Sequence, residues 1–132
     1  MKKRTRIIAA LSIVAAGTAG MVIAQQPGFS RVLLQTVDLS TPGKVAVQAR
    51  AEFDPGMAAG RHTHPGEELT YVLEGQVELR IDGQPPRIIK AGETFAVPAG
   101  VVHDGVNTGG TRAKVFATYI VEKGQPLATP AK

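Results

Sequence analysis

Three histidines are the residues of this chain best suited to chemistry, and two of them stand one residue apart. His62 and His64 would share one face of a β-strand, because side chains alternate between its two faces, whereas on a helix they would diverge. Neutral imidazole nitrogens are common ligands of transition metals. The spacing therefore predicts a strand on which both side chains converge on one metal ion. His103 is the third histidine of the chain, and it would add a third nitrogen.

A carboxylate is available directly after the paired histidines. Pro65 and Gly66 predict a turn, which would bring Glu67 or Glu68 back beside the histidines on the next strand. Apolar alternation does not choose between these two acids, since both faces of the following segment carry apolar residues. Three imidazoles and one carboxylate would leave open coordination positions on a divalent metal. Such a set suits one Fe, Mn, Ni, Cu, Co or Zn ion better than Ca or Mg.

Short strands separated by turns account for the rest of the chain. Apolar and polar residues alternate over 45–53 and 77–82, and Gly and Pro residues fall between such runs. No segment of a dozen residues after Ala24 combines helical periodicity with a cap. The chain has 132 residues, enough for one domain, and it has no cysteine, which excludes disulfides, thiolate metal sites and a cysteine nucleophile. These features predict an all-β sandwich or barrel that ends in a loose tail over residues 124–132.

Two motifs with fixed spacing make the chain resemble a small single-domain cupin. The first motif is formed by Gly56, His62, His64, Glu68 and Gly75, and the second by Gly92, Pro98, Gly100, His103 and Asn107. The resemblance implies a single cupin-type β-barrel, built as a jelly-roll-like double sheet. It implies that the metal ligands are His62, His64, Glu68 and His103, and so it favours Glu68 over Glu67. It also implies structural roles for Asn107 and for the motif glycines, which would permit turns and close backbone approach.

The excess positive charge of the chain is concentrated at its N-terminus. Four of the 15 basic residues lie within the first six positions, and the other eleven balance the 11 acidic residues. A neutral body argues against a nucleic-acid partner. The apolar run over residues 7–24 follows the basic start, a layout typical of secretory signals. We therefore expect residues 1–24 to be a signal peptide or N-terminal anchor, with cleavage after Ala24. Residues 25–132 would then form an exported cupin domain, periplasmic or secreted, which would contact a membrane only if the leader stayed uncleaved.

Other catalytic arrangements are weakly represented. The serines lie outside the motif region, and the chain contains neither a G-x-S-x-G elbow nor a phosphate-binding P-loop. Tyr71 and Asp104 are near the expected ligands in sequence and would be available as acid or base, although a tyrosine in a strand more often packs. Arg61 is expected to point away from the site, because it alternates with His62. No catalytic residue is assigned from the sequence.

The resemblance implies several functions that fold and ligands do not separate. We favour a metal-dependent oxidoreductase of the dioxygenase type that acts on a small organic molecule. The alternatives are a non-enzymatic module that binds a small ligand or metal, and a metal-dependent lyase or isomerase. Inward side chains such as Thr70 and Val72 are expected to shape the pocket. The segment 114–121 is apolar on both faces, which predicts a homodimer.

Overall fold

Every regular element of the computed structural model is a β-strand in the part that the structure describes, residues 21–132. The strands are β1 (Met21–Gln26), β2 (Phe29–Asp38), β3 (Lys44–Phe53), β4 (His62–Thr63), β5 (Gly66–Glu74), β6 (Gln76–Ile81), β7 (Arg87–Lys90), β8 (Thr94–Val97), β9 (His103–Val106), β10 (Ala113–Glu122) and β11 (Thr129–Pro130). Over these residues no helix is long and apolar enough to cross a membrane. The all-β prediction is confirmed.

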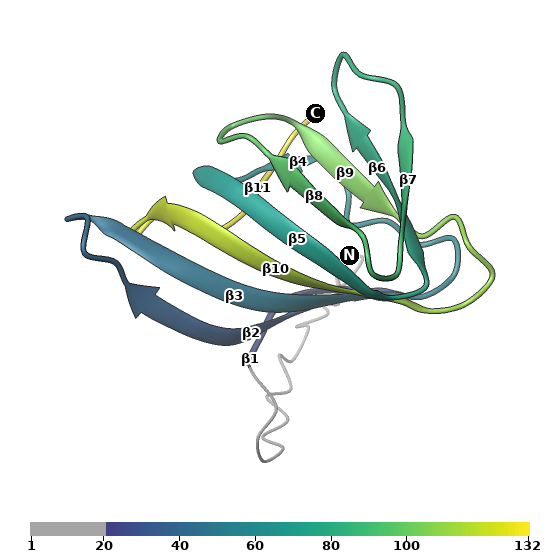
Figure 1. The fold of residues 1–132 in the computed structure, drawn as a ribbon, viewed down its shortest axis with the longest axis horizontal. Helices are drawn as coiled ribbons and strands as arrows, with labels where there is room; N and C mark the ends of the chain where they lie inside the picture. The colour runs from purple at the N-terminus through teal and green to yellow at the C-terminus, as the bar shows by residue number, and fades with distance from the viewer. Residues whose placement is uncertain (1–20) are drawn as a thin grey trace, which may run out of the picture.

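Two antiparallel sheets face each other, as Figure 1 shows. The larger sheet has six strands in the order β1-β2-β3-β10-β5-β8, and the smaller has five in the order β11-β4-β9-β6-β7. This arrangement confirms the expected jelly-roll-like double sheet. The two sheets remain separate hydrogen-bonded units and do not close into a continuous barrel.

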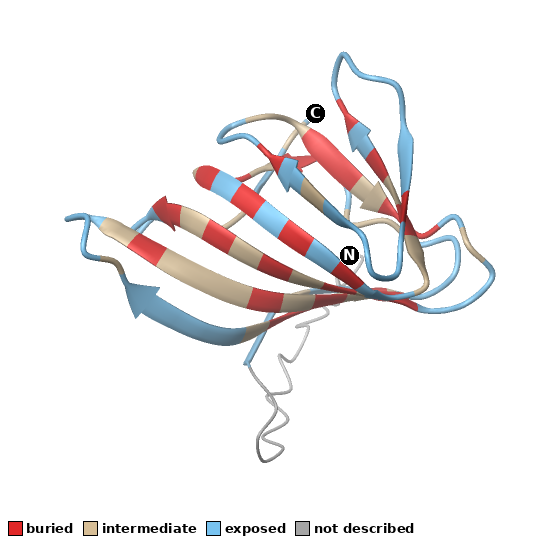
Figure 2. Ribbon diagram, viewed as in Figure 1, coloured by how far each residue is buried: buried red, intermediate tan, exposed pale blue. Residues whose placement is uncertain are grey.

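The core lies between the sheets and follows the alternation seen in the sequence. Val77, Leu79 and Ile81 of β6 are buried, and so are Ala51 and Phe53 of β3. Figure 2 shows the resulting stripes, in which buried residues alternate with exposed ones along β5. Because strand side chains point to opposite faces in turn, this pattern fixes which face of each strand looks toward the site.

The turns at Gly75, Gly92 and Gly100 have the structural role that the resemblance implies. All three have positive φ angles, of 68°, 89° and 72°, a conformation that other residues rarely adopt. At Gly75 space is also short, since a Cβ atom there would lie 2.6 Å from the carbonyl oxygen of Arg112. Gly75 therefore lets the chain pass from β5 to β6 close against the start of β10.

The C-terminal segment is ordered against the smaller sheet, so the expectation of a loose tail is wrong. Thr129 and Pro130 form β11, which pairs with Thr63 and His62 of β4. The amide of Ala131 donates a hydrogen bond of 2.9 Å to the carbonyl of Arg61. The sequence does not predict this strand, because it is only two residues long and contains a proline. It forms by pairing with β4.

The predicted leader lies largely outside the described residues. Positions 1–20 are not described, and the last four leader residues belong to β1, which pairs with β2. The predicted boundary after Ala24 therefore falls within β1.

Candidate metal centre

The four expected ligands come from both sheets and meet between them. His62 lies on β4 and is the register partner of His103 on β9, in the smaller sheet. Glu68 lies on β5 in the larger sheet, and His64 lies in the short connection between β4 and β5. The turn at Pro65 leads into the next strand and brings Glu68 beside the histidines, as expected. It carries the chain across to the opposite sheet, so that Glu68 faces the histidines across the interior.

The side chains form one tight, buried cluster. The Nε2 atoms of His62 and His64 are 3.1 Å apart. Oε2 of Glu68 lies 3.1 Å from Nε2 of His64 and 2.9 Å from Nε2 of His103. One ligand atom from each of the four residues lies within 4.8 Å of all the others.

Backbone carbonyls fix the tautomer of all three histidines. Nδ1 of His62 donates to the carbonyl of Gly60 at 2.6 Å, and Nδ1 of His64 donates to that of Leu127 at 2.6 Å. Nδ1 of His103 donates to the carbonyl of Val101 at 2.9 Å. A carbonyl oxygen can only accept, so each Nδ1 carries a proton, and in the neutral ring Nε2 presents a lone pair. Metal-binding histidines are oriented in the same way.

This geometry fits a single divalent metal ion. Two Nε2 lone pairs facing each other at 3.1 Å repel unless a cation lies between them. Atoms about 2.1 Å from a metal stand about 3.0 Å apart along the edge of an octahedron, and about 3.4 Å apart along that of a tetrahedron. Three of the six separations among the donor atoms, 2.9 to 3.1 Å, match the octahedral edge. Four donors in an octahedron leave two positions for other ligands.

Glu68, rather than Glu67, belongs to the cluster. Glu68 is buried, whereas Glu67 is exposed on the outer face of β5. The hydroxyl of Thr70 donates to Oε1 of Glu68 at 2.8 Å, which leaves Oε2 directed at the histidines. Burial opposes ionisation of Glu68, but the interactions with His103 and His64 outweigh it and hold its pKa far below the usual range. Their Nε2 atoms donate to Oε2 only while the rings carry a second proton, and in the neutral rings these lone pairs are left for a cation. The carboxylate is therefore charged and ready to bind a cation.

The histidines differ in how readily they take up a proton. Burial, the largest effect, lowers the pKa of His62 to about 4. Burial also acts to lower the pKa of His103, but the hydrogen bond and the charge of Glu68 outweigh it and raise that pKa above 6.5. His62 therefore takes up a proton less readily than a free histidine does, whereas His103 takes one up more readily, and that proton competes with a metal.

Comparison with known proteins assigns the family. A model of the cupin domain matches residues 49–130, more than half of the chain. The chain belongs to the cupin family. Both motifs lie within or beside the matched region, and the cluster described above is formed by this cupin's own motif residues.

Curated relatives of this cupin include a regulator and several plant proteins. It is 29% identical to the HTH-type transcriptional regulator PuuR of Escherichia coli over 93 residues, which are 70% of this chain and 50% of that protein. It is 32% identical to oxalate oxidase 2 of Hordeum vulgare over 78 residues, 53% of this chain and 35% of the other. The chain thus spans half the length of the regulator and about a third of the oxidase.

Solved structures support the same fold. Recombinant oxalate oxidase in complex with glycolate matches with a TM-score of 0.63 and 25% identity, over 81% of this chain and 57% of that one. An RmlC-like cupin from Shewanella frigidimarina matches with a TM-score of 0.62 and 23% identity, over 83% of this chain and 91% of the other. The latter match, which covers most of both chains, concerns the fold alone.

Residues around the cluster hold its ligands in place. Oδ1 of Asp104 accepts a hydrogen bond of 2.9 Å from the amide of Gly60, the residue whose carbonyl orients His62. Burial raises the pKa of Asp104. Asn107 is fully buried and donates to the carbonyls of Phe53 and Thr111, in keeping with the structural role implied for it.

Two residues considered from the sequence lie away from the site. Tyr71 is exposed on the outer face of β5, so it is not available to the cluster as an acid or base. Arg61 points outward and forms an ion pair of 2.6 Å with Asp82, as its alternation with His62 predicted.

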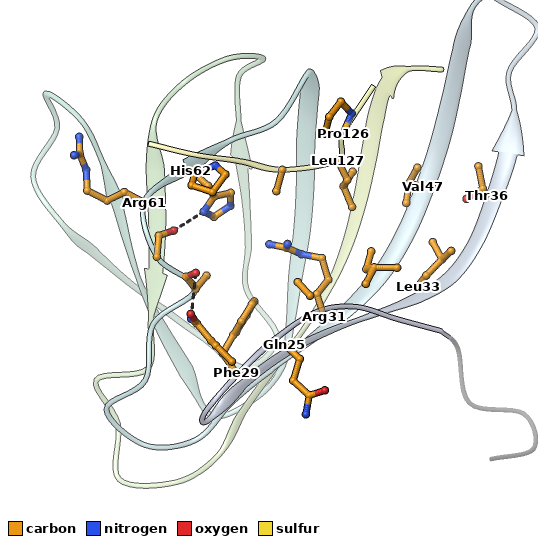
Figure 3. Close-up of a pocket in the computed structure, with 17 residues that line it drawn as sticks. Gln25, Phe29, Arg31, Leu33, Thr36, Val47, Arg61, His62, Pro126 and Leu127 are labelled. Atoms are coloured by element: carbon orange, nitrogen blue, oxygen red, sulfur yellow. Dashed lines mark hydrogen bonds between the residues drawn. The ribbon is translucent and has the colours of Figure 1, made fainter. Parts of the chain in front are cut away.

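A cavity of about 720 Å³ adjoins the cluster at His62 (Figure 3). Its walls come from β1, β2, β3, the segment before β4 and the C-terminal segment. Thr70 and Val72 point inward as expected, but Thr70 supports Glu68 and Val72 packs in the core.

Three contributors to the site were not predicted from the sequence. They are the carbonyl of Leu127, the ring of Tyr119, whose centroid lies 4.5 Å from that of His64, and buried Arg31. No local sequence pattern predicts these residues. An arginine at a buried position of β2 would indicate a functional role, but only after the inward face of that strand is known.

Proposed function

We propose that this cupin binds one divalent transition metal through His62, His64, Glu68 and His103, and that it acts as a metal-dependent oxidoreductase on a small organic molecule. The observation that carries the proposal is the convergence of Nε2 lone pairs and a charged carboxylate at octahedral spacing. The ion would be Fe, Mn, Ni, Cu, Co or Zn. When bound, such an ion supplies a Lewis acid and, if it is redox-active, the means to react dioxygen with a substrate.

The chain's own residues would prepare the site for that chemistry. The carbonyls of Gly60, Leu127 and Val101 keep the imidazoles oriented, and Thr70 holds Glu68. A small cavity of about 30 Å³, bordered by His62, Glu68 and His103, leaves room for little more than an ion or one water. Phe29 and Tyr119 also border it and keep bulk water out. The large cavity on the other side of His62 provides the route for an organic ligand.

The comparisons support oxidative chemistry on an organic acid. Relatives named oxalate oxidase match about half of this chain, and one such structure is described in complex with glycolate. The dioxygenase type remains our proposal, because the matched region covers only part of those proteins.

One observation favours a second candidate, a non-enzymatic ligand-binding module. The match to the regulator PuuR covers more of this chain than the oxidase matches do. A cupin within a regulator would bind a small ligand without turnover. Here the same site and cavity would serve as a binding pocket.

Dioxygen uptake separates these candidates. Protein loaded in turn with Fe, Mn, Ni, Cu or Co would be mixed with small organic acids in an oxygen-electrode cell. The oxidoreductase proposal expects sustained uptake with at least one metal and acid, abolished in His103→Ala but kept in the surface control Arg87→Gln. Binding of an acid, measured by calorimetry, without uptake under any of these conditions would favour the module instead.

We also propose that the chain is exported. Support comes from the basic start and the apolar run over residues 7–24. Intact-mass measurement of protein from the native host would give a mature chain that starts at Gln25, and a full-length chain retained with the membrane would argue for an anchor.

A further inference from the structure

Arg31 is a buried cation that forms no ion pair with a carboxylate of the described residues. The residue lies on β2 and is only 6% exposed, and its Nε atom has no hydrogen-bond partner. Its guanidinium lies 5.6 Å from the ring centroid of Phe29 and 6.0 Å from that of Tyr119. The Tyr119 hydroxyl also interacts with the guanidinium, but the Nε–H donor is left without a partner.

Arg31 stands where the small cavity at the cluster meets the large one. It borders both, together with Phe29, Ala59 and His62. In Figure 3 its guanidinium points from β2 into the pocket, with His62 on one side and Leu33, Val47 and Leu127 on the other. Its charge also reaches the cluster: burial is the main cause of the lowered pKa of His62, and Arg31 adds to it. A ligand entering the large cavity would therefore meet Arg31 beside the proposed metal.

Charge balance at this place calls for an anion. Three neutral imidazoles and one carboxylate would leave a bound divalent ion with one net positive charge, and Arg31 adds a second, so a bound monoanion would offset one of the two. Buried charges are unfavourable unless they are paired. The free Nε–H is one of the donors that arginine uses to hold a planar carboxylate with two parallel hydrogen bonds.

We infer that Arg31 binds the carboxylate of an organic monoanion, whose apolar body occupies the cavity lined by Leu33, Val47 and Leu127. The inference rests on the proposed metal site and names the class of ligand that this site takes. Arg31 would hold the carboxylate beside the open metal positions, and the cavity would select the remainder of the molecule.

The cavity favours an organic acid with a body over a small inorganic anion or a two-carbon acid. Its volume of about 720 Å³ lies within the usual range for ligand pockets, roughly 300–1,000 Å³. Leu33, Val47 and Leu127 offer apolar contact, which stabilises each methylene group that leaves water. A two-carbon acid would reach Arg31 but would leave most of these contacts unused.

Calorimetric titration with four probes tests the inference: hexanoate, its neutral analogue hexanamide, acetate and inorganic phosphate. The proteins are the full chain with Mn²⁺ added, the variants Arg31→Gln and Arg31→Lys, and the matched charge control Arg87→Gln, which is exposed on β7. Elemental analysis reports the metal content of each sample, and thermal melting reports its folding.

We expect wild type to bind hexanoate at least tenfold more tightly than hexanamide, acetate or phosphate. Arg31→Gln should lose at least tenfold in hexanoate affinity, with hexanamide affinity and metal content unchanged. Arg31→Lys should keep the preference for hexanoate over hexanamide, and Arg87→Gln should behave as wild type.

The inference is overturned if wild type prefers hexanamide, acetate or phosphate, if hexanoate does not bind, or if Arg31→Gln binds hexanoate as wild type does. If Arg31→Gln fails to fold, the affinities of wild type for the four probes still test the inference. Stoichiometric metal without any preference for hexanoate would contradict the role of Arg31 and leave the metal proposal standing. Absence of metal would contradict the proposed function, and the probes on metal-free protein would still test Arg31.

Discussion

At the scale of single residues, proton and metal compete for the same atoms. Nε2 of His103 lies 2.9 Å from Oε2 of Glu68 and, when protonated, donates a hydrogen bond to it. Burial lowers the pKa of His103, but this interaction outweighs burial and raises it. His62, whose pKa burial lowers to about 4, offers a lone pair at any moderate pH. Metal binding is therefore coupled to the loss of one proton, at His103.

Metal affinity should consequently depend on pH in two regions. Below the raised pKa of His103, binding must displace its proton, so affinity falls by about tenfold per pH unit as the pH decreases. The decline begins above pH 6.5, higher than an ordinary histidine predicts, and steepens near pH 4 when His62 also takes up a proton. Chelator-competition titrations with Mn²⁺ between pH 5 and pH 9 would measure the part of the decline that His103 causes. An affinity that is constant over that range would contradict the assigned role of His103.

Asp104 is expected to act on the site indirectly, as a positioning residue. Its Oδ1 holds the amide of Gly60, and the carbonyl of Gly60 orients His62. Asp104→Ala should lower metal affinity by roughly 10–100-fold, the usual effect of losing a group that orients a ligand. Asp104→Asn keeps an oxygen acceptor and should stay within a few-fold of wild type. Thermal melting would check that both variants are folded. Equal metal affinities of the two folded variants would show that the hydrogen bond from Gly60 to Asp104 does not affect metal binding.

At the scale of elements, the site depends on where strands change sheets. The connection from β4 to β5 places His62 and Glu68 on opposite walls, and β9 returns His103 beside β4. Close approaches at turns keep these strands in register. Replacing a glycine at such a turn is therefore expected to destabilise the fold more than replacing a positive-φ glycine with open space around it.

Gly75 and Gly83 provide a matched comparison of that expectation. Both have positive φ angles, but a Cβ at Gly75 would meet the carbonyl of Arg112, whereas at Gly83 nothing lies within 4 Å. Gly75→Ala should lower the free energy of unfolding by about 3 kcal/mol, since it combines strain with a backbone clash. Gly83→Ala should cost about 1 kcal/mol from strain alone. Urea denaturation measures the free energy of unfolding of both variants. Equal decreases would mean that the added Cβ at Gly75 fits beside Arg112 without destabilising the fold.

The sequence predicts local patterns well and tertiary contacts poorly. The alternation at Val77 and Leu79 depends on neighbours in the chain, and the structure bears it out. The close spacing of His62 and His64 predicted that they converge, which they do, although His64 lies just after β4 rather than on it. The hydrogen bond between His64 and the carbonyl of Leu127 joins residues 63 positions apart, and no sequence pattern around Leu127 predicts it. The choice of Glu68 needed the family spacing, because apolar residues occupy both faces of β5.

At the scale of the whole molecule, the larger sheet presents an apolar outer face. Leu69, Tyr71 and Leu73 of β5 are exposed there, beside Phe116 and Ile120 of β10. The homodimer expected from the segment 114–121 would use this face, since β10 lies in the middle of the sheet between β3 and β5. Exposed apolar patches of this kind commonly mark association surfaces.

Mass in solution tests that arrangement. We expect a dimer at micromolar concentration by light scattering, and a monomer for Tyr71→Lys, which places a charge in the middle of the patch. Ile88→Lys, on the exposed side of β7 in the other sheet, is the control and should remain dimeric. A monomeric wild type, or a dimer that Tyr71→Lys leaves intact, would count against this face.

The central claim, a metal held by three histidines and one glutamate, is tested most directly by metal content. Wild type incubated with each of the six candidate ions and then desalted should retain close to one ion per chain for at least one of them, measured by elemental analysis. His103→Ala should retain much less of that ion while melting as a folded protein, because the apolar core is independent of the cluster. A wild type that stays metal-free with every ion, or a His103→Ala variant that binds as well as wild type, would contradict the account.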